Sequence, residues 1–244
     1  MRSIVSTFKE NYKLYLMEAL GLAFFMVSAC FFWAHLASPD SPYSALVPAL
    51  NHKLYIMGFA MGVTALIIFY SPVTSPSGAH INPAVTLTMF RLGKINLTDT
   101  FFYILFQFIG GLLGVVIMKV ILGKMLITAP VTYVITVPGK YGVIPAAITE
   151  LTIAFIMMCM VLFTSDSKVL KNWTKIIAGV LVMCYVIVSG PISGFGMNPA
   201  RTFASAFPAG VYYSFWIYMF VPIAGMLIAS EFYLHVKKHN NEKV

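Results

Sequence analysis

Long apolar stretches alternate with short polar ones along the whole chain. Six of these stretches are long enough to cross the hydrocarbon core of a membrane, which takes about 20 helical residues. The six stretches are Leu14–Ala37, Leu54–Tyr70, Phe101–Leu122, Ala146–Phe163, Ile176–Ser189 and Val211–Val236. The fifth stretch is short, and we expect its helix to extend into the flanking residues on both sides.

Within these stretches the hydrophobicity does not alternate from one residue to the next, as it does in the strands of a membrane barrel. Because only helices and closed barrels satisfy every backbone hydrogen bond in lipid, the pattern predicts six transmembrane helices. The first stretch is too long for the core of a cleavable signal peptide and contains Glu18. We therefore expect it to remain in the protein as a spanning helix.

Two further apolar segments, Ala84–Phe90 and Ala200–Phe207, are too short to span a membrane. Each follows a glycine-containing loop, and each begins at the last residue of the same tripeptide. The tripeptide is Asn82, Pro83 and Ala84 in the first copy and Asn198, Pro199 and Ala200 in the second. Upstream of each copy an apolar stretch contains a glutamate, Glu18 or Glu150; the glutamates are 132 residues apart and the asparagines 116. The chain therefore contains an internal duplication.

Each copy, at residues 10–123 and 144–237 approximately, holds three full spans and one short helix. Since three is an odd number, the second copy must cross the membrane upside down relative to the first. Inverted repeats place their functional site where the halves meet at the membrane midplane. The loops before the short helices are tolerable there only if they are buried or line a water-filled cavity. The sequence predicts one all-α membrane domain over residues 1–244 that encloses such a cavity.

The two tripeptides indicate what the cavity presents. Asparagine is a favoured N-cap and proline suits the first helical turn, so a single copy can merely begin a helix. Two copies at matched positions favour a role for the asparagines beyond starting a helix. The cap uses the side-chain oxygen, which leaves the NH₂ groups of Asn82 and Asn198 free to donate into the cavity. Two positive helix-dipole ends at the same place disfavour cations and protons, but not neutral hydrogen-bonding solutes.

The composition agrees with a membrane location. Hydrophobic residues make up 59% of the chain and charged residues 10%, and the mean hydropathy is +0.86. A globular domain is about 25% charged. A cytosolic enzyme, a disordered chain and a nucleic-acid-binding protein are thereby excluded. The three cysteines, Cys30, Cys159 and Cys184, lie in apolar stretches without metal-ligand spacing, so we expect packing residues and no disulfide, metal or other cofactor.

The formal net charge of +8 fits membrane orientation. With both termini in the cytoplasm, eleven Lys and Arg residues lie on that side: Arg2, Lys9, Lys13, Arg91, Lys94, Lys168, Lys171, Lys175, Lys237, Lys238 and Lys243. Four lie on the opposite side: Lys53, Lys119, Lys124 and Lys140. Cytoplasmic loops are the richer in Lys and Arg. We expect cytoplasmic termini and a multi-pass location in a plasma membrane or a bacterial inner membrane.

The doubled tripeptide in a six-span chain resembles the aquaporin, or major intrinsic protein (MIP), family. The resemblance covers almost the whole chain and rests on Ser77–Thr86, Asn198–Arg201, the two glutamates, Gln107 with Gly110 and Gly111, and Pro222 with Gly225. It implies a passive channel for water or small uncharged solutes, not an enzyme, in a homotetramer with one pore per subunit. It also places Arg201 at the outer constriction, where the guanidinium donates hydrogen bonds and repels cations.

Four polar residues near the duplication have alternative interpretations. Arg201 could extend to the surface, but its apolar neighbours favour a pore-lining position. Glu18 and Glu150 could relay protons, but no chain of titratable partners accompanies them. We favour carboxylates that accept hydrogen bonds from the N–H groups of the short-helix loops. His80 could sense pH; because it matches a common histidine of the family, we favour a structural hydrogen bond near the cytoplasmic entrance.

The expected selectivity filter has four positions. Counted back from Arg201, two of them are Phe195 and Val186. The second-span position is assigned to Phe59, with Gly62 as the alternative if no gap is allowed. Water-selective relatives carry histidine in place of Val186 and a small residue in place of Phe195, whereas glycerol facilitators carry an aromatic residue at the latter. The filter therefore combines features of both groups.

Other positions favour water as the main solute. Thr202 stands where glycerol facilitators have aspartate, and Ala206 stands where they have a basic residue. Phe215 and Trp216 occupy a pair that is aromatic in water channels, although both could simply face lipid or pack. We predict a water pore that also leaks small neutral solutes, with a glycerol facilitator as the alternative.

Three other classes fit the sequence less well. An ion-coupled secondary transporter also uses inverted repeats and broken helices, but only Glu18 and Glu150 could hold its coupling ion. An intramembrane enzyme would need a catalytic motif such as HExxH, which is absent from the sequence. A structural adhesion protein would conduct nothing after purification.

Overall fold

The structure is a computed structural model, and it describes residues 4–241. Every regular element in this range is helical. The long helices are α1 (Ile4–Ala37), α2 (Leu50–Tyr70), α4 (Leu97–Leu122), α6 (Val143–Asp166), α7 (Thr174–Ser193) and α9 (Phe215–Asn241). The short elements are η1 (Ser75–Ser77), α3 (Pro83–Arg91), α5 (Lys124–Ile127), η2 (Thr132–Val134), η3 (Lys171–Trp173) and α8 (Pro199–Ala209).

Six helices in the described range are long and apolar enough to cross a membrane, which confirms the predicted fold class. The short fifth stretch becomes α7 by extending at both ends, to Thr174 and Ser193. The last spanning helix begins at Phe215 rather than Val211, because the chain turns at Gly210 and Ser214, where φ is 66° and 52°. Both residues lie in the left-handed region, which interrupts a right-handed helix.

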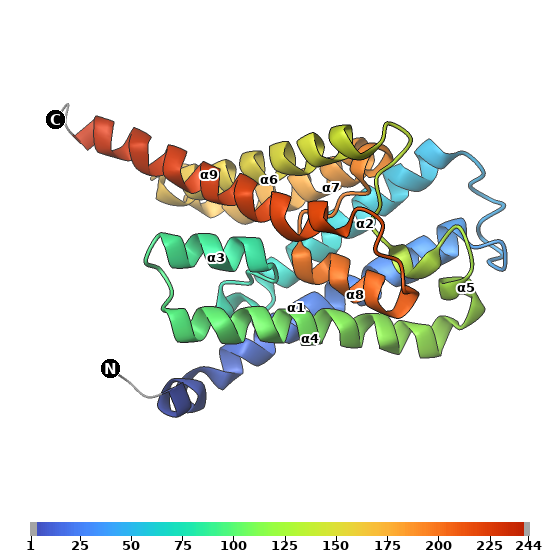
Figure 1. The fold of residues 1–244 in the computed structure, drawn as a ribbon, viewed down its shortest axis with the longest axis horizontal. Coiled ribbons are helices and arrows are strands. Elements are labelled where there is room, and N and C mark those ends of the chain that lie inside the picture. The colour runs from blue at the N-terminus through green and yellow to red at the C-terminus, as the bar shows by residue number, and fades with distance from the viewer. Residues whose placement is uncertain (1–3, 242–244) are drawn as a thin grey trace.

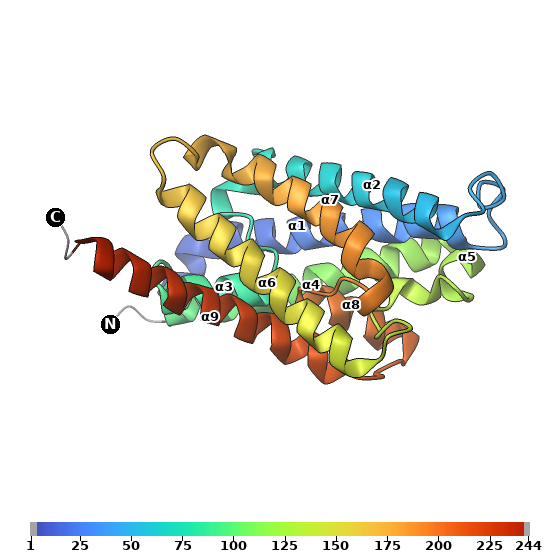
Figure 2. The same ribbon diagram turned by 90° about the horizontal axis from the view of Figure 1, so that it is seen from above.

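The long helices form one bundle. The first and the last described residues lie at the same end of this bundle (Figure 1). The loop between α1 and α2 lies at the opposite end, together with α5 (Figures 1 and 2). The short helices α3 and α8 lie among the long helices, approximately in line with one another (Figure 1). They run outward from the middle of the bundle towards its two ends.

Glycines allow two pairs of long helices to approach closely. A Cβ atom on Gly110 of α4 would lie 2.1 Å from the backbone oxygen of Ala19 in α1. A Cβ atom on Gly225 of α9 would lie 2.7 Å from the backbone oxygen of Leu151 in α6. Small residues are the usual means by which membrane helices come into contact. The pairs α1–α4 and α6–α9 therefore form the framework on which the half-helices rest.

The segment between α5 and α6 folds back over the end of the bundle opposite the chain termini. The N–H of Gly139 in this segment donates to the backbone oxygen of Ile192 at 2.9 Å. A Cβ atom on Gly194 would lie 3.0 Å from the Thr136 methyl group. The segment is thereby held against the loop that leads into α8, and Thr136 is brought close to the half-helix.

Candidate functional site

The half-helices α3 and α8 meet at their N-terminal ends through two asparagines. Asn82 caps α3 by accepting from the N–H of Ala84 at 2.9 Å. Asn198 caps α8 by accepting from the N–H of Arg201 at 3.2 Å. Both asparagines are buried, and both line the same cavity. The predicted caps are therefore present, and they lie in the interior of the bundle.

Each asparagine also binds the loop that leads to the other half-helix. The amide nitrogen of Asn82 donates to the backbone oxygen of Met197 at 2.9 Å. The amide nitrogen of Asn198 donates to the backbone oxygen of Ile81 at 2.7 Å. The expectation of a wholly free NH₂ group is thus wrong, because one of its two hydrogens fastens the halves together. An amide nitrogen carries two hydrogens, so one donor of each asparagine remains for the cavity.

The loops before α3 and α8 follow similar backbone paths. Each has three residues with positive φ values between 42° and 88°: Gly78, Ala79 and Ile81 in the first loop and Gly194, Phe195 and Met197 in the second. Residues other than glycine are uncommon in this region and cost free energy there. Such conformations persist only where surrounding contacts hold them, and the two buried glutamates supply those contacts.

Glu18 of α1 holds the first loop with four hydrogen bonds. One carboxylate oxygen accepts from the Ser77 hydroxyl at 2.6 Å and from the His80 N–H at 3.0 Å. The other accepts from the Ile81 N–H at 2.5 Å and from the Gln107 amide at 2.7 Å. The carboxylate is fully buried, and its acceptor sites are occupied by donors of the loop and of α4.

Glu150 of α6 holds the second loop in the same way but with three donors. One carboxylate oxygen accepts from the Ser193 hydroxyl at 2.6 Å and the Gly196 N–H at 2.8 Å. The other accepts from the Met197 N–H at 2.6 Å. Both glutamates therefore act as acceptors for backbone N–H groups that have positive-φ neighbours. Buried backbone donors need such partners.

Two tyrosines complete the matched frame, and the sequence reading missed both. The hydroxyl of Tyr103 in α4 donates to the backbone oxygen of Ser77 at 2.9 Å. The hydroxyl of Tyr218 in α9 donates to the backbone oxygen of Ser193 at 2.7 Å. The tyrosines are 115 residues apart, almost the spacing of the asparagines. A search for equal residues at the repeat spacing would have found them.

His80 lies in the first loop and lines the cavity beside Asn82. One ring nitrogen lies 3.2 Å from the hydroxyl oxygen of Thr86, and the ring is 5.3 Å from that of Tyr103. Its backbone N–H donates to Glu18. The side chain thus has a hydrogen-bond partner in the first turn of α3.

Two cavities lie on either side of the junction. The first, of about 400 Å³, extends from the asparagines towards the end of the bundle that holds the chain termini, where Lys171 and Lys175 line it. The second, of about 360 Å³, lies towards the other end, where Arg201 and the segment Pro130–Gly139 line it. Phe25 and Phe195 line both cavities, so the two cavities adjoin, and together they are called the path below.

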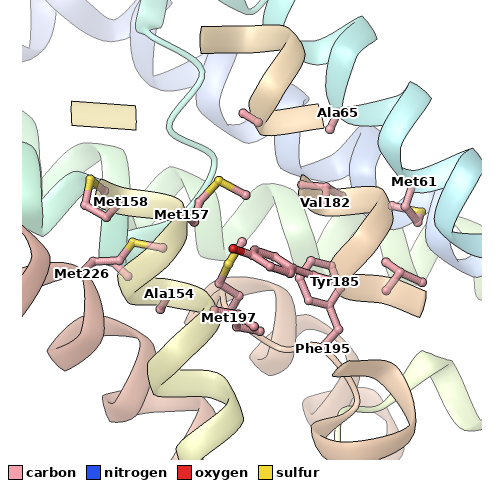
Figure 3. Close-up of a cluster of buried hydrophobic side chains, with 14 of the residues drawn as sticks. Met61, Ala65, Ala154, Met157, Met158, Val182, Tyr185, Phe195, Met197 and Met226 are labelled. Atoms are coloured by element: carbon pink, nitrogen blue, oxygen red, sulfur yellow. The ribbon is translucent and has the colours of Figure 1, made fainter. Parts of the chain in front are cut away.

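Apolar side chains dominate the walls of the path near the junction. Met157, Phe195 and Met197 line the first cavity, and Figure 3 shows Tyr185, which lines neither cavity, packed beside Phe195. The rings of Tyr185 and Phe195 are 6.2 Å apart between centroids. A solute passing here would find few hydrogen-bond partners other than those of the loops and the asparagines.

Arg201 follows the second tripeptide and lines the second cavity. Its side chain is buried, and its guanidinium donates to the hydroxyl of Thr136 in the segment between α5 and α6. The sequence reading did not anticipate Thr136, since nothing in the order of residues indicates that this segment folds back over the path. Thr202 and Ala206 in α8 are also buried, whereas Trp216 is exposed.

Three of the four expected filter residues line the second cavity: Val186, Phe195 and Arg201. The assignment of Phe59 is wrong. Its side chain is 64% exposed on the outside of α2 and does not line the cavity. The alternative, Gly62, faces α7 instead, because a Cβ atom there would lie 2.9 Å from that of Met183.

The α2 side chains that do line the second cavity are Leu54, Met57 and Met61. Successive helical residues are 100° apart, so Phe59, two positions from either methionine, points to the opposite face. Counting residues along the sequence gave the correct helix but the wrong face. The apolar wall contributed by α2 consists of a leucine and two flexible thioether side chains rather than an aromatic ring.

Six membrane-spanning helices, with two half-helices capped head to head between two cavities, define a helical membrane protein with an internal path. A family model described as "Major intrinsic protein" matches residues 5–233. The chain belongs to this family. The family assignment covers the entire site described above.

Individual relatives agree with this assignment. The chain is 29% identical to aquaporin TIP2-3 of Arabidopsis thaliana over 92% of this chain and 87% of the relative. It is 28% identical to aquaporin NIP1-2 of the same plant over 72% of this chain and 60% of the relative. The chain spans only 57% to 62% of the length of the first three relatives matched.

A solved structure has the same fold. The X-ray structure of the aquaglyceroporin from Plasmodium falciparum superimposes with a TM-score of 0.77, over 91% of this chain and 95% of that chain. The two sequences are 20% identical. The likeness therefore concerns the arrangement of the helices.

Proposed function

We propose that this protein is a passive membrane channel for water, with small uncharged solutes as a slower second cargo, and that it excludes protons and ions. The observation that carries the proposal is the pair of asparagines at the junction. Each lines the first cavity at the N-terminal end of a helix, and each has a second amide hydrogen beyond the one donated to the opposite loop. Donors and positive dipole ends at one point suit oxygen atoms of neutral solutes and oppose cations.

The proposed roles of the other residues follow from their positions. Arg201 adds a fixed positive charge to the second cavity, and Val186 and Phe195 supply apolar walls. Met57 and Met61 take the place that Phe59 was expected to fill. Glu18 and Glu150 hold the loops, with four and three hydrogen-bond donors on their carboxylates, and we assign them no proton relay.

The orientation proposed for the chain has both termini in the cytoplasm of a plasma membrane or a bacterial inner membrane. The excess of Lys and Arg on that side supports it. Arg2 and Lys243 belong to this excess but lie outside the described residues. We also propose that the whole chain forms one channel domain with inverted repeats, and that four copies assemble with one path in each.

Osmotic measurements test the proposal. Purified protein in liposomes is mixed rapidly with sucrose, and shrinkage reports water flux; mixing with glycerol then reports solute uptake from the reswelling phase. We expect shrinkage faster than in empty liposomes, and glycerol uptake slower than water loss. Shrinkage no faster than in empty liposomes would refute the channel. Glycerol uptake faster than water loss would favour a glycerol facilitator.

Asn198→Asp tests the role of the junction. The change places a carboxylate at the end of α8, and we expect sodium or potassium leak to rise while water flux persists. The matched control is Asn51→Asp, the same change on the exposed start of α2. Equal ion leak in both variants and in the unmodified protein would contradict the role assigned to Asn198.

A glycerol facilitator remains the second candidate because one observation favours it. The path contains Val186 and Phe195, which offer an apolar wall beside the donors of Arg201. A polyol presents an apolar and a polar face, and such a wall fits it. Gradient-driven, saturable uptake of a solute together with an ion would instead indicate a secondary transporter.

A further inference from the structure

Thioether side chains are concentrated on the walls of the first cavity. The methionines that line it come from four separate elements: Met89 of α3, Met157 of α6, Met197 of the second loop and Met226 of α9. Figure 3 shows Met157, Met197 and Met226 in one region of the bundle. Among the described residues that line either cavity there is no cysteine. The sulfur on these walls is therefore thioether sulfur.

We propose that Met157 and Met197 are modification sites, where hydrogen peroxide that enters the path oxidises the thioether to a sulfoxide. The proposal rests on the proposed function, because it requires a small neutral solute to enter the first cavity. Hydrogen peroxide is neutral, and like water it both donates and accepts hydrogen bonds through O–H groups. The features that admit water to the cavity therefore suit the peroxide as well.

The reaction needs no group beyond the thioether and the peroxide. A lone pair of the sulfur attacks one peroxide oxygen, so that the S–O bond forms as the O–O bond breaks. The sulfur is oxidised and the peroxide is reduced. The departing hydroxide takes the proton from the transferred oxygen and leaves as water, and the product is methionine sulfoxide.

The asparagines of the junction supply donors beside this reaction. Met197 directly precedes Asn198, and its backbone oxygen accepts one amide hydrogen of Asn82 at 2.9 Å. Both asparagines line the same cavity as the two methionines. An amide hydrogen that remains on either asparagine can bond to the departing oxygen, which gains negative charge as the O–O bond breaks.

Helix α6 carries two adjacent methionines that differ in their access to the cavity. Met157 lines the first cavity, whereas Met158 lines neither cavity and has no exposed surface. Successive helical residues are about 100° apart, and Figure 3 shows the two side chains pointing in different directions. A peroxide in the path can therefore reach the first sulfur and not the second. The pair provides an internal control within one helix.

Oxidation would change what the wall presents to a solute. A sulfoxide replaces an apolar, flexible side chain by a polar one that carries an additional oxygen. This oxygen accepts hydrogen bonds, so it competes with the solute for the free amide hydrogens of Asn82 and Asn198. It also takes up space in the cavity. We therefore expect an oxidised channel to conduct less water than the reduced one.

Peptide mapping by mass spectrometry tests the sites. Proteoliposomes of the unmodified protein are treated with hydrogen peroxide, and the oxidised fraction of each methionine is followed in time. We expect Met157 and Met197 to react about tenfold faster than Met158. In protein unfolded in dodecyl sulfate the three should react at similar rates, because the difference arises from the fold. A rate in the folded protein no higher than that of Met158 would overturn the assignment of that residue.

Leucine variants connect the modification to water flux. Leucine is similar in volume to methionine and has no sulfur to oxidise. Peroxide treatment should lower the water permeability of the unmodified protein and of the control Met158→Leu. The double variant Met157→Leu with Met197→Leu should keep the permeability that it has before treatment. An equal loss in the double variant, which retains all three cysteines, would refute the effect of these thioethers on flux.

The two measurements separate this proposal from the proposed function. The mapping needs no variant, so it decides the sites even where the double variant does not fold. Oxidised sites with unchanged water permeability would confirm the modification and refute its effect. An unmodified protein that conducts no water before treatment would refute the proposed function, whereas the oxidation rates would still show whether peroxide reaches the cavity.

Discussion

The two halves of the chain build the junction from matched parts and differ in what surrounds it. Each half supplies an asparagine cap, a buried glutamate and a tyrosine that binds the loop. The residue after the tripeptide is Val85 in the first half and Arg201 in the second. Val85 lines the first cavity, and Arg201 lines the second. The matched parts hold the geometry, whereas the unmatched residue adds a buried guanidinium to the second cavity, and the charged residues that line the first, Lys171 and Lys175, come from another part of the chain.

A second difference between the halves concerns the threonine that follows Val85 in one and Arg201 in the other. In the first half the Thr86 hydroxyl accepts from the Gln107 amide at 3.0 Å and lies 3.2 Å from a His80 ring nitrogen. The second half has Gly196 and Pro222 at the places of His80 and Gln107. The Thr202 hydroxyl is buried, and no protein group in the described residues bonds to it. Divergence has removed both partners and kept the threonine.

The largest expected effect comes from the glutamates. In Glu150→Gln the new NH₂ group would face the Ser193 hydroxyl and the Gly196 N–H, or the Met197 N–H. A buried donor is then left unpaired, and the remaining bonds are no longer charge-assisted. We expect the free energy of unfolding in detergent to fall by about 4 kcal/mol. Thermal unfolding of the purified protein measures it. A loss below about 1 kcal/mol would show that the carboxylate does not hold the loop.

Glu18→Gln should be milder, and this contrast tests the difference between the halves. Gln107 can turn its amide and accept from the new NH₂ group, whereas Pro222 at the equivalent position of α9 cannot. We expect Glu18→Gln to lose about 1 kcal/mol less than Glu150→Gln. Combining Glu18→Gln with Gln107→Leu should abolish this advantage. An equal loss in both single variants would contradict it.

The next effect concerns the close helix contacts. Gly110→Ala places a methyl group against the Ala19 backbone oxygen, where nothing can rotate away, and we expect a loss of about 3 kcal/mol. Gly225→Ala meets the backbone oxygen of Leu151 at a longer distance, so we expect about 1 kcal/mol. Gly93→Ala, which has open space around its Cβ position, shows the cost of a positive φ without any contact. Equal losses for Gly110 and Gly225 would show that the two helix pairs tolerate the same displacement.

A smaller effect separates the two threonines. Thr86→Val removes a hydroxyl that bonds with Gln107, and we expect a loss of about 1.5 kcal/mol. Thr202→Val replaces an unpaired buried hydroxyl with a methyl group of similar size, and we expect no loss or a slight gain in stability. Both values come from thermal unfolding under identical conditions. A loss for Thr202→Val as large as that for Thr86→Val would reveal a bound water at Thr202.

The smallest difference should appear at the tyrosines, where the halves agree. Tyr103→Phe and Tyr218→Phe each remove one hydrogen bond to a loop carbonyl, and we expect about 1 kcal/mol from either. Tyr12→Phe, on an exposed position of α1, serves as the control. If the losses of stability in the two variants differed by more than about 1 kcal/mol, the loops would depend on their tyrosines to different extents.

Much of the architecture could be predicted because each feature depends on residues that are close together in the sequence. Spanning helices need about 20 apolar residues, and all six predicted stretches became long helices. Asn82 and Asn198 mark helix starts by their own chemistry. The helix ends could not be predicted from hydrophobicity, because left-handed residues such as Ser214 stop a helix without any change in hydrophobicity.

The contacts of the site were harder to predict because they join distant parts of the chain. The order of residues places Phe59 in the right helix, but only packing decides which face of α2 borders the cavity, and that face carries Met57 and Met61. Thr136 meets Arg201 because its segment folds back over the bundle.

By itself the sequence determined the spans, the duplication and the two capped half-helices, because hydrophobic length and capping chemistry act over a few neighbouring residues. Only the tertiary structure decided that each asparagine donates one amide hydrogen to the loop before the opposite half-helix. It also brought Phe25 and Phe195, which lie 170 positions apart, to the same point of the path. Contacts between such distant residues are determined by side-chain packing, and packing depends on all the surrounding helices at once.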